Sequence, residues 1–454
     1  MDLMDTTIVN VALPALGSEL HATDTTFEWV VNGYLLSLAI FIPASGWIGD
    51  RFGTKKTFLF ALSVFTLGSG LCSFAPSIQL LILFRIFQGV GGGMMTPVGT
   101  TMLFRAFPPQ ERANASAVLA IPAALAPAIG PTLGGWLVDF AGWRWIFLVN
   151  IPIGIAGFLF SLHYLKELQE KTTSKFDLAG FLLSGIGLSL LLYALSVVPT
   201  RGIGSLNVII SGIGGVILLA LMVKVETGSK HPILHLLLFR ERLFRTANLV
   251  MFFAFAMWLG FLFLLPVFLQ QLGGFSAFQT GLTLSPQAIG WLAVSSIASR
   301  LYPKLKPRLM ISLGLAGATA MTAFFIFIQP QANLWVLRFL LFIRGFSMGF
   351  AVIPVQAAVF TNISSKETGQ ASSLFNTNRQ VAASLGVALV GTVLFELQRL
   401  GSFSDTESYR IAFAVSTLLG VIAVVFALTI KNQDAAASFI KNQDQQSQVK
   451  MRNS

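Results

Sequence analysis

Apolar residues run in long stretches along the whole chain, and short polar segments separate them. Fourteen stretches reach the roughly 20 residues that a helix needs to cross a hydrocarbon layer about 30 Å thick. The pattern therefore predicts an all-α polytopic membrane protein. The predicted spans are 3–20, 28–48, 57–76, 78–104, 113–138, 145–165, 177–199, 207–225, 247–269, 280–299, 309–329, 334–358, 369–397 and 409–430.

The composition agrees with this pattern. Charged residues make up 11% of the 454 residues, against roughly 25% in soluble domains, and hydrophobic residues make up 54%. These values exclude a water-soluble fold. The single cysteine, Cys72, excludes a disulfide framework and a cysteine-based metal site. Residues 1–10 contain two Asp and no basic residue, so they lack the basic segment of a secretory signal.

Basic residues indicate how the spans are oriented. Of the 30 Lys and Arg residues, 22 fall in the loops and tail on the side of both termini, and four fall on the opposite side. By the positive-inside rule both termini are cytoplasmic, in the inner membrane. The net charge of +11 then follows from topology, and we expect no nucleic-acid partner. The other four basic residues lie within spans: Arg85, Arg338, Arg344 and Arg379.

The chain contains an internal repeat at an offset of 256 residues. Seven identities at this one offset lie at corresponding places in the helix order, although single glycine matches are easily found by chance. Parallel repeats in membrane proteins normally place a substrate site between them, near the bilayer midplane. The identical pairs are Gly89/Gly345, Gly93/Gly349, Glu111/Glu367, Ala115/Ala371, Ser116/Ser372, Gly130/Gly386 and Gly135/Gly391.

The repeat predicts two six-helix halves plus an inserted two-helix hairpin. The predicted segments are 1–165 for the N-terminal half, 166–246 for a linker with two extra spans (about 177–199 and 207–225) and a cytoplasmic loop, 247–430 for the C-terminal half, and 431–454 for a polar cytoplasmic tail.

The short loop between the second and third spans contains several residues with conformational roles. Gly46 lets a neighbouring helix approach, and Gly53 permits a tight turn. Asp50 can accept from a helix N-terminus or pair with a base, and Arg51 follows it. A positive-inside hairpin is the simpler interpretation, but it would require only basic residues.

Arg85 lies deep in the span 78–104, where an arginine is costly unless it faces a partner or water. Among the nineteen acidic residues, only Asp5 lies at a comparable depth away from a loop, so we expect it to pair with Arg85. A carboxylate beside a cation can exchange a proton as its access to water changes. A static structural ion pair is the alternative.

The glycines after Arg85 follow no strand, which favours helix packing over a phosphate loop.

The fifth span is rich in glycine and proline. Proline removes a backbone donor and bends a helix, while glycines one turn apart form a flat face for a neighbour. We expect this helix to bend and slide as a gate. The gating residues that we predict in it are Gly130, Pro131, Gly134 and Gly135.

Polar residues within apolar spans are candidates for a substrate cavity. An interhelical hydrogen-bond cluster explains Asn376 and Arg379 equally well. The candidates are Asn10, Gln88, Gln356, Asn376 and Arg379.

Aromatic and histidine residues give weaker indications. Phe255 and Trp258 belong to a helically spaced aromatic set that could stack on a lipophilic compound, although lipid-facing packing is the simpler explanation. His231 and His235 are spaced like metal ligands, but they lack a nearby Cys or acid pair. We predict no metal site.

Three of these segments resemble signatures of the major facilitator superfamily. Gly46 to Lys56 resembles the loop signature G-x-L-x-D-R-x-G-R-K, from which Ile48 and Thr54 depart. The segment that starts at Arg85 resembles R-x-x-Q-G. The segment that starts at Gly130 resembles G-P-x-x-G-G, the antiporter signature of drug exporters, which the symporters of the superfamily lack.

Residues 5–14 and 143–154 extend the resemblance to the fourteen-span drug:proton antiporters of the EmrB/QacA type, over nearly the whole chain. In that family a long apolar segment precedes the aspartate of the first span, whereas four residues precede Asp5 here. We therefore expect the true start to lie upstream, or the chain to be truncated.

The resemblance implies a major facilitator fold and proton-driven efflux of lipophilic drugs by alternating access. Asp5 would bind the proton and Arg85 would tune it, while Asp50 and Arg51 would latch one conformation. The energy source would be the proton gradient, with no cofactor and no enzymatic activity. Membrane lipid is a further expected partner, and a periplasmic adaptor and an outer-membrane channel remain open.

Two other functions stay open. A facilitator-type transporter of one metabolite would share the halves but should lack the segment at Gly130, and a polytopic membrane enzyme would need a catalytic acid or histidine cluster. With one carboxylate and four arginines inside the spans, neutral, zwitterionic or anionic substrates are at least as plausible as divalent cations.

Overall fold

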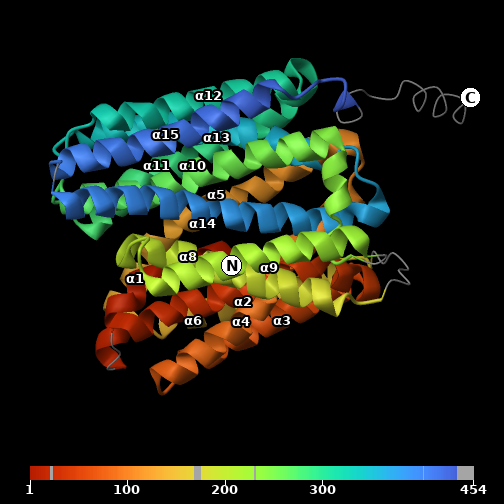
Figure 1. Ribbon diagram of the computed structural model, residues 1–454, viewed down its shortest axis with the longest axis horizontal. Helices are drawn as coiled ribbons and strands as arrows, with labels where there is room; N and C mark the ends of the chain where they lie inside the picture. The colour runs from red at the N-terminus through yellow and green to blue at the C-terminus, as the bar shows by residue number, and fades with distance from the viewer. Residues whose placement is uncertain (21–23, 168–174, 230–231, 402, 437–454) are drawn as a thin grey trace, which may run out of the picture.

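The computed structural model describes residues 1–20, 24–167, 175–229, 232–401 and 403–436. Within these ranges the chain is helical, without a strand, and its long helices run side by side along the longest axis of the molecule (Figure 1). Eleven of the helices described are long and apolar enough to cross a membrane. The predicted all-α polytopic fold is therefore confirmed.

A helix lies at each of the fourteen predicted spans, with ends that differ by a few residues. The sixth span consists of two helices that are joined at Val149. The α-helices are α1 (Asp2–Glu19), α2 (Asp24–Phe52), α3 (Thr54–Ser73), α4 (Ile78–Ala106), α5 (Arg112–Ala141), α6 (Trp145–Leu148), α7 (Asn150–Tyr164), α8 (Leu178–Arg201), α9 (Leu206–Gly228), α10 (Arg242–Gln271), α11 (Ala277–Leu305), α12 (Pro307–Phe324), α13 (Leu334–Val359), α14 (Thr368–Leu400) and α15 (Asp405–Leu428). Short 3-10 helices are η1 (Pro109–Glu111), η2 (Leu236–Arg240), η3 (Phe325–Phe327) and η4 (Ser365–Glu367).

Local sequence signals explain where several helices begin and end. Gly53 separates α2 from α3 with a φ of 97°, a backbone conformation that side chains disfavour, so the tight turn predicted at this glycine is present. At the other end of the bundle, Ser276 and Ser404 start α11 and α15 as capping boxes with Gln279 and Glu407. We call the end with Gly53, whose loops are rich in Lys and Arg, the basic end.

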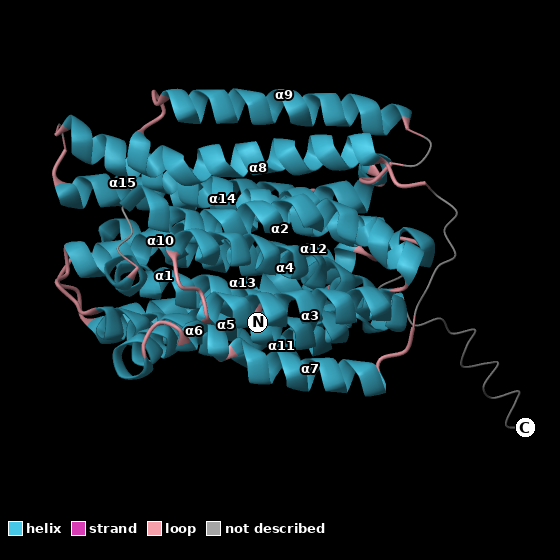
Figure 2. Ribbon diagram, turned by 90° about the horizontal axis from the view of Figure 1, so that it is seen from below, coloured by secondary structure: helices cyan, strands magenta, loops and turns pink. Residues whose placement is uncertain are grey.

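The helices pack as two groups with a hairpin beside them. We refer to α1–α7 as the first half and to α10–α15 as the second half. The halves meet where α5 packs on α11 and where α2 packs on α14. The hairpin α8–α9 packs against α2 and α14 through α8, and Figure 2 shows it at the edge opposite α7. The exact division of the chain into domains stays a prediction.

Large apolar side chains are exposed on the outer helices. Leu159 and Phe160 project from α7, and Ile209, Ile210 and Ile213 project from α9. Contiguous apolar surface of this kind is unfavourable in water and favourable against lipid. The outer faces therefore fit the hydrocarbon layer that the sequence predicts.

Candidate functional site

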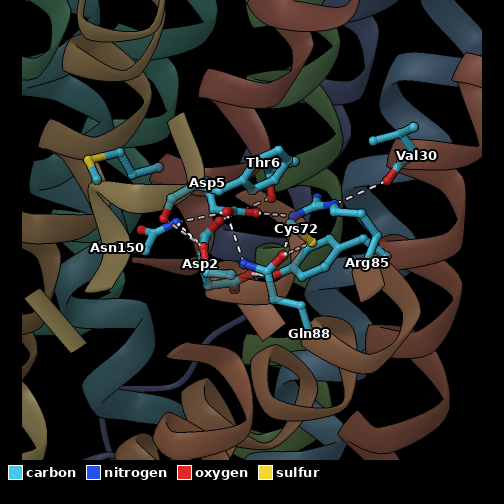
Figure 3. A network of polar contacts seen from close by, with 12 residues as sticks. Asp2, Asp5, Thr6, Val30, Cys72, Arg85, Gln88 and Asn150 are labelled. Carbon is cyan, nitrogen blue, oxygen red and sulfur yellow. Dashed lines mark hydrogen bonds and ion pairs between the residues drawn. The ribbon is translucent and has the colours of Figure 1, made fainter. Parts of the chain in front are cut away.

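A buried carboxylate forms the centre of a polar network in the first half (Figure 3). Arg85 Nη1 on α4 donates to Asp5 Oδ2 on α1 at 2.5 Å, so the expected ion pair is present. Gln88 Nε2 donates to Asp5 Oδ1 at 3.1 Å, and Asn150 Nδ2 donates to the same oxygen at 2.9 Å. Asn150 Nδ2 also donates to Ser69 Oγ on α3 at 3.1 Å. Side chains from α4 and α7 thus contact one acid on α1, and α3 joins the network through Ser69.

The guanidinium of Arg85 is held by further contacts. Its Nε donates to the Val30 carbonyl at 3.1 Å, and Nη1 also donates to Gln88 Oε1 at 2.7 Å. The guanidinium carbon lies 4.1 Å from the centroid of the Tyr34 ring. Asp5 and Arg85 are both 0% exposed, so removing either charge would leave the other uncompensated in a region of low dielectric constant.

Asp2 is a second carboxylate beside this network, and the sequence interpretation missed it. The hydroxyl of Tyr34 donates to Asp2 Oδ1, and the ring of Tyr34 lies against Arg85. Asp2 precedes Asp5 by three residues on a helix, which places both side chains on one face of α1. Helical spacing was therefore the signal that could have identified Asp2. Tyr34 and Ser69 carry no comparable signal, because long-range packing brings them to the site.

At the basic end, α2 and α14 approach each other closely. The Gly46 amide donates to Ser373 Oγ at 2.8 Å, and Ser45 Oγ lies 2.9 Å from the same oxygen. A Cβ on Gly46 would lie 2.6 Å from the carbonyl oxygen of Gly369. The close helix approach predicted at Gly46 is therefore present, and its partner is the second half.

Charged residues reinforce this contact. Asp50 Oδ1 lies 2.6 Å from Arg105 Nη2, and Arg105 Nε donates to the Ser365 carbonyl of the second half at 3.1 Å. The sequence interpretation paired Asp50 with the neighbouring Arg51 as a latch, but it did not single out Arg105. Arg51 is exposed in the last turn of α2. Arg105 therefore connects Asp50 to the other half.

A second contact between the halves lies nearby. Arg112 Nη1 donates to the carbonyl of Phe360, and the rings of Phe104 and Phe360 stack with centroids 4.2 Å apart. Hydrogen bonds that join the halves thus gather at the basic end. These contacts hold the two halves together at this end.

The glycine face of α5 packs directly on the helix that carries Asp5. A Cβ at Gly130 would lie 2.0 Å from Thr7 Oγ1, and a Cβ at Gly134 would lie 3.2 Å from Ile8 Cγ2. Gly135 is partly buried, and the side chain of Pro131 lies outside the described residues. The G-P-x-x-G-G segment is therefore next to the acid of the network, which the sequence did not predict.

The candidate cavity residues do not form one cluster. Gln88 belongs to the Asp5 network. In the second half, Gln356 is buried in α13, and Asn376 Nδ2 donates to the Ser372 carbonyl of its own helix at 2.8 Å. Arg379 lies over the ring of Phe255. The side chain of Asn10 lies outside the described residues.

The histidines provide little support for a metal centre. His235 Nδ1 lies 4.0 Å from Glu367 Oε1, and His231 lies outside the described residues. Within the part of the chain that is described, no group of three or more His, Cys, Asp or Glu residues could hold a metal ion. The absence of a metal stays a prediction.

Comparison with known proteins identifies relatives over most of the chain. Residues 1–387 match the sequence model of the Major Facilitator Superfamily. The multidrug resistance protein B homolog of Mycobacterium tuberculosis (strain ATCC 25618 / H37Rv) is 36% identical over 395 residues, which are 86% of this chain and 73% of that protein. The putative multidrug resistance protein MdtD of Escherichia fergusonii is 32% identical over 435 residues, or 94% of this chain and 92% of that protein.

A solved structure agrees with the fold. The crystal structure of the human organic anion transporter MFSD10 superposes with a TM-score of 0.64, covering 94% of this chain and 96% of that one. The sequence identity is 15%, so this similarity concerns the fold alone.

Proposed function

The chain belongs to the major facilitator superfamily, and on that premise we propose that it exports small lipophilic molecules from the cytoplasm in exchange for protons. Membership identifies a family of membrane transporters, and several relatives are named as multidrug resistance proteins. The observation that carries the proton coupling is the buried ion pair between Asp5 and Arg85.

Asp5 is suited to bind and release a proton. Its carboxylate is buried beside a guanidinium, and protonation would cancel an attraction that is strong where water is excluded. The protonated acid would also bond differently with Gln88 and Asn150, because one of its oxygens would then donate. Protonation therefore changes contacts among α1, α4 and α7 at the same time.

The neighbouring glycine face would couple this change to helix movement. Gly130 of α5 contacts Thr7, two residues after Asp5, so a shift of α1 bears directly on α5. The side chain of Arg105 and the helix crossing at Gly46 would hold the basic end closed in the conformation that receives the proton from the opposite side. Release of these contacts would open the basic end to the cytoplasm.

The proton gradient would supply enough energy. One charge that moves through 100 mV is worth about 2.3 kcal/mol, which sustains a substrate gradient of roughly fiftyfold. A nucleotide is not needed for this exchange, and the proposal includes no cofactor. A periplasmic adaptor and an outer-membrane channel stay predictions.

Proteoliposomes with an imposed pH gradient test the proposal. Three naphthalene compounds of different charge serve as probes: naphthoate, naphthalenemethanol and naphthylmethyl-trimethylammonium. We expect the gradient to drive uphill movement of at least one probe by the intact chain but not by Asp5→Asn. Asp139→Asn, which alters an exposed carboxylate of α5, should retain this activity. Uphill movement by Asp5→Asn would refute the coupling scheme.

The orientation is tested separately. We propose that the basic end faces the cytoplasm of an inner membrane, with both termini there. Cysteines introduced at the exposed positions Gly204 and Lys304 lie at opposite ends of the bundle, while the native Cys72 is buried. A membrane-impermeant thiol reagent added to spheroplasts should label Gly204→Cys and spare Lys304→Cys. Labelling of Lys304→Cys but not of Gly204→Cys would show that the proposed orientation is wrong.

A further inference from the structure

The guanidinium of Arg379 contacts no acidic side chain among the residues that the structure describes. It lies in α14, and its guanidinium carbon is 4.5 Å from the ring centroid of Phe255 and 5.7 Å from that of Phe375. Its Nε is buried and has no hydrogen-bond acceptor in the part of the chain that is described, and none of the ion pairs found there includes Arg379. An arginine at membrane depth is costly when it lacks such a partner.

Two tryptophans extend the same cluster. The Phe255 ring is 5.2 Å from that of Trp258, and Trp258 is 5.2 Å from Trp291. Both tryptophans are more than nine-tenths buried, and each indole N–H lacks an acceptor among the described residues. Buried N–H groups are normally paired, and an indole nitrogen can only donate. Each unmatched nitrogen in this cluster thus requires an acceptor.

The second half has little negative charge of its own. Between Glu241 and Glu396 the sequence contains one acidic residue, Glu367, at the basic end just before α14 begins. Arg379 lies on α14, which packs on α2 and α4 of the first half as well as on α10. It therefore belongs to a helix of the interface where a superfamily with parallel repeats is expected to hold its substrate.

We propose that Arg379, Phe255, Trp258 and Trp291 form a binding site for an aromatic organic anion, such as an aryl carboxylate. The guanidinium binds the anionic group, the indole N–H groups donate to its acceptor atoms, and the rings pack against the arene. The inference rests on the proposed export function and specifies its substrate class. Export of a monovalent anion in exchange for a proton moves two charges in the direction that an inside-negative potential favours, so it exploits the gradient more fully than export of a neutral compound.

Binding of the three naphthalene probes to the purified full-length chain in nanodiscs tests the site without a proton gradient. We expect the intact chain to prefer naphthoate. Arg379→Gln should weaken naphthoate binding at least about tenfold, the worth of one charged hydrogen bond, and should change naphthalenemethanol binding less than about twofold. Arg379→Lys should recover part of the loss, because it restores the charge without the planar fork.

Two more variants separate a binding role from a structural role. Arg338 lies over Trp335, with 4.8 Å between its guanidinium carbon and the ring centroid, so Arg338→Gln removes an equivalent charge outside the site and should leave naphthoate binding unchanged. Trp258→Phe keeps a ring and removes the N–H, and it should weaken naphthoate binding by about fivefold while the melting temperature holds. This variant keeps the test decisive if Arg379→Gln does not fold.

The outcomes distinguish the site from the transport proposal. An intact chain without preference for naphthoate, equal losses for all three probes in Arg379→Gln, or the same loss in Arg338→Gln would overturn the site. Asp5→Asn should still bind naphthoate but should not move it uphill. If Asp5→Asn moves naphthoate uphill while Arg379→Gln alone loses binding, the coupling scheme fails and the anion site stands.

Discussion

Two buried arginines occupy related places in the two halves and differ in their partners. The repeat offset of 256 aligns Gln88, one turn after Arg85, with Arg344 of α13. Arg85 pairs with the carboxylate of Asp5, whereas Arg344 donates to Gln287 Oε1 at 2.8 Å and to Thr322 Oγ1 at 2.9 Å. Both side chains are nearly inaccessible to water, at 0% and 1% exposed.

The difference shows how one scaffold can hold a static and a titratable site. An amide oxygen and a hydroxyl stay neutral over the physiological pH range, so a change in pH does not alter the contacts of Arg344. The guanidinium of Arg344 also lies 3.8 Å from the ring centroid of Phe261, which provides a neutral surface. A carboxylate can gain a proton, and therefore the contacts of Arg85 can change. The proposed proton coupling therefore belongs to the first half, and we expect Arg344 to have a structural role.

The largest effect is expected from Asp5→Asn, which makes the first site as neutral as the second. The amide can still accept from Arg85, but it cannot exchange a proton at physiological pH. Proton-driven transport in proteoliposomes should fall at least about a hundredfold, the lower end of what a positioned proton-transfer group contributes to a rate. Retained proton-driven transport would place the coupling group elsewhere.

Removing each arginine in turn should affect stability unequally. Arg85→Gln leaves the Asp5 carboxylate buried without a cation, which should destabilise the protein by about 3–5 kcal/mol. Arg344→Gln leaves only neutral acceptors, at a cost of about 1–3 kcal/mol. Thermal unfolding in detergent at neutral pH compares the two variants. Lowering the pH should rescue part of the loss in Arg85→Gln alone, since protonated Asp5 needs no cation. Equal losses and equal pH dependence would remove the distinction.

The glycine pair Gly130 and Gly386, which the repeat also aligns, gives a smaller contrast. A Cβ at Gly130 would meet Thr7 Oγ1 at 2.0 Å, whereas a Cβ at Gly386 would meet the Ala256 carbonyl oxygen at 2.1 Å. A side chain can turn away and a helix backbone cannot, so Gly386→Ala should cost about 1–3 kcal/mol and Gly130→Ala less. Adding Thr7→Ala should restore the stability of Gly130→Ala. If Thr7→Ala does not restore stability, the clash with the Thr7 side chain is not the cause of the loss in Gly130→Ala.

The smallest effect is expected from Asp2→Asn. The hydroxyl of Tyr34 can donate to an amide oxygen as well as to a carboxylate, so the contact survives without its charge. The hydrogen bond to the neutral amide should be weaker by about 1 kcal/mol, so we expect proton-driven transport to be roughly fivefold slower. The rate is measured beside that of Asp5→Asn. A loss as large as that of Asp5→Asn would make the two carboxylates one proton-binding unit.

The sequence predicted the helices and the ion pair between Asp5 and Arg85. The helices depend on local apolar stretches, and the pair could be predicted because acidic residues within spans are scarce. Each span needs only an apolar stretch of sufficient length, and Asp5 was the one acid recognised at the depth of Arg85. Partners such as Asn150, Tyr34 and Arg105 could not be predicted, because polar residues at helix ends and faces are common. Only the packing of distant helices brings these three to their sites.

The aromatic set in α10 shows the same limit. Its spacing identified Phe255 and Trp258 as one face of a helix, which fits lipid contact as well as ligand binding. Burial of Trp258, which packs against Trp291 of α11, and the position of Arg379 of α14 over Phe255 decide against lipid contact. Helical periodicity specifies a face, whereas the neighbouring helix specifies what that face contacts.

Proton exchange at Asp5 is tested most directly by comparing counterflow with proton-driven transport in the same proteoliposomes. Counterflow requires substrate binding and alternation of the two halves but no net proton movement. For a probe that the intact chain carries, Asp5→Asn should retain counterflow and lose accumulation driven by a pH gradient, with Asp139→Asn active in both assays. Accumulation by Asp5→Asn at the rate of the intact chain would contradict the assignment of the transported proton to this carboxylate.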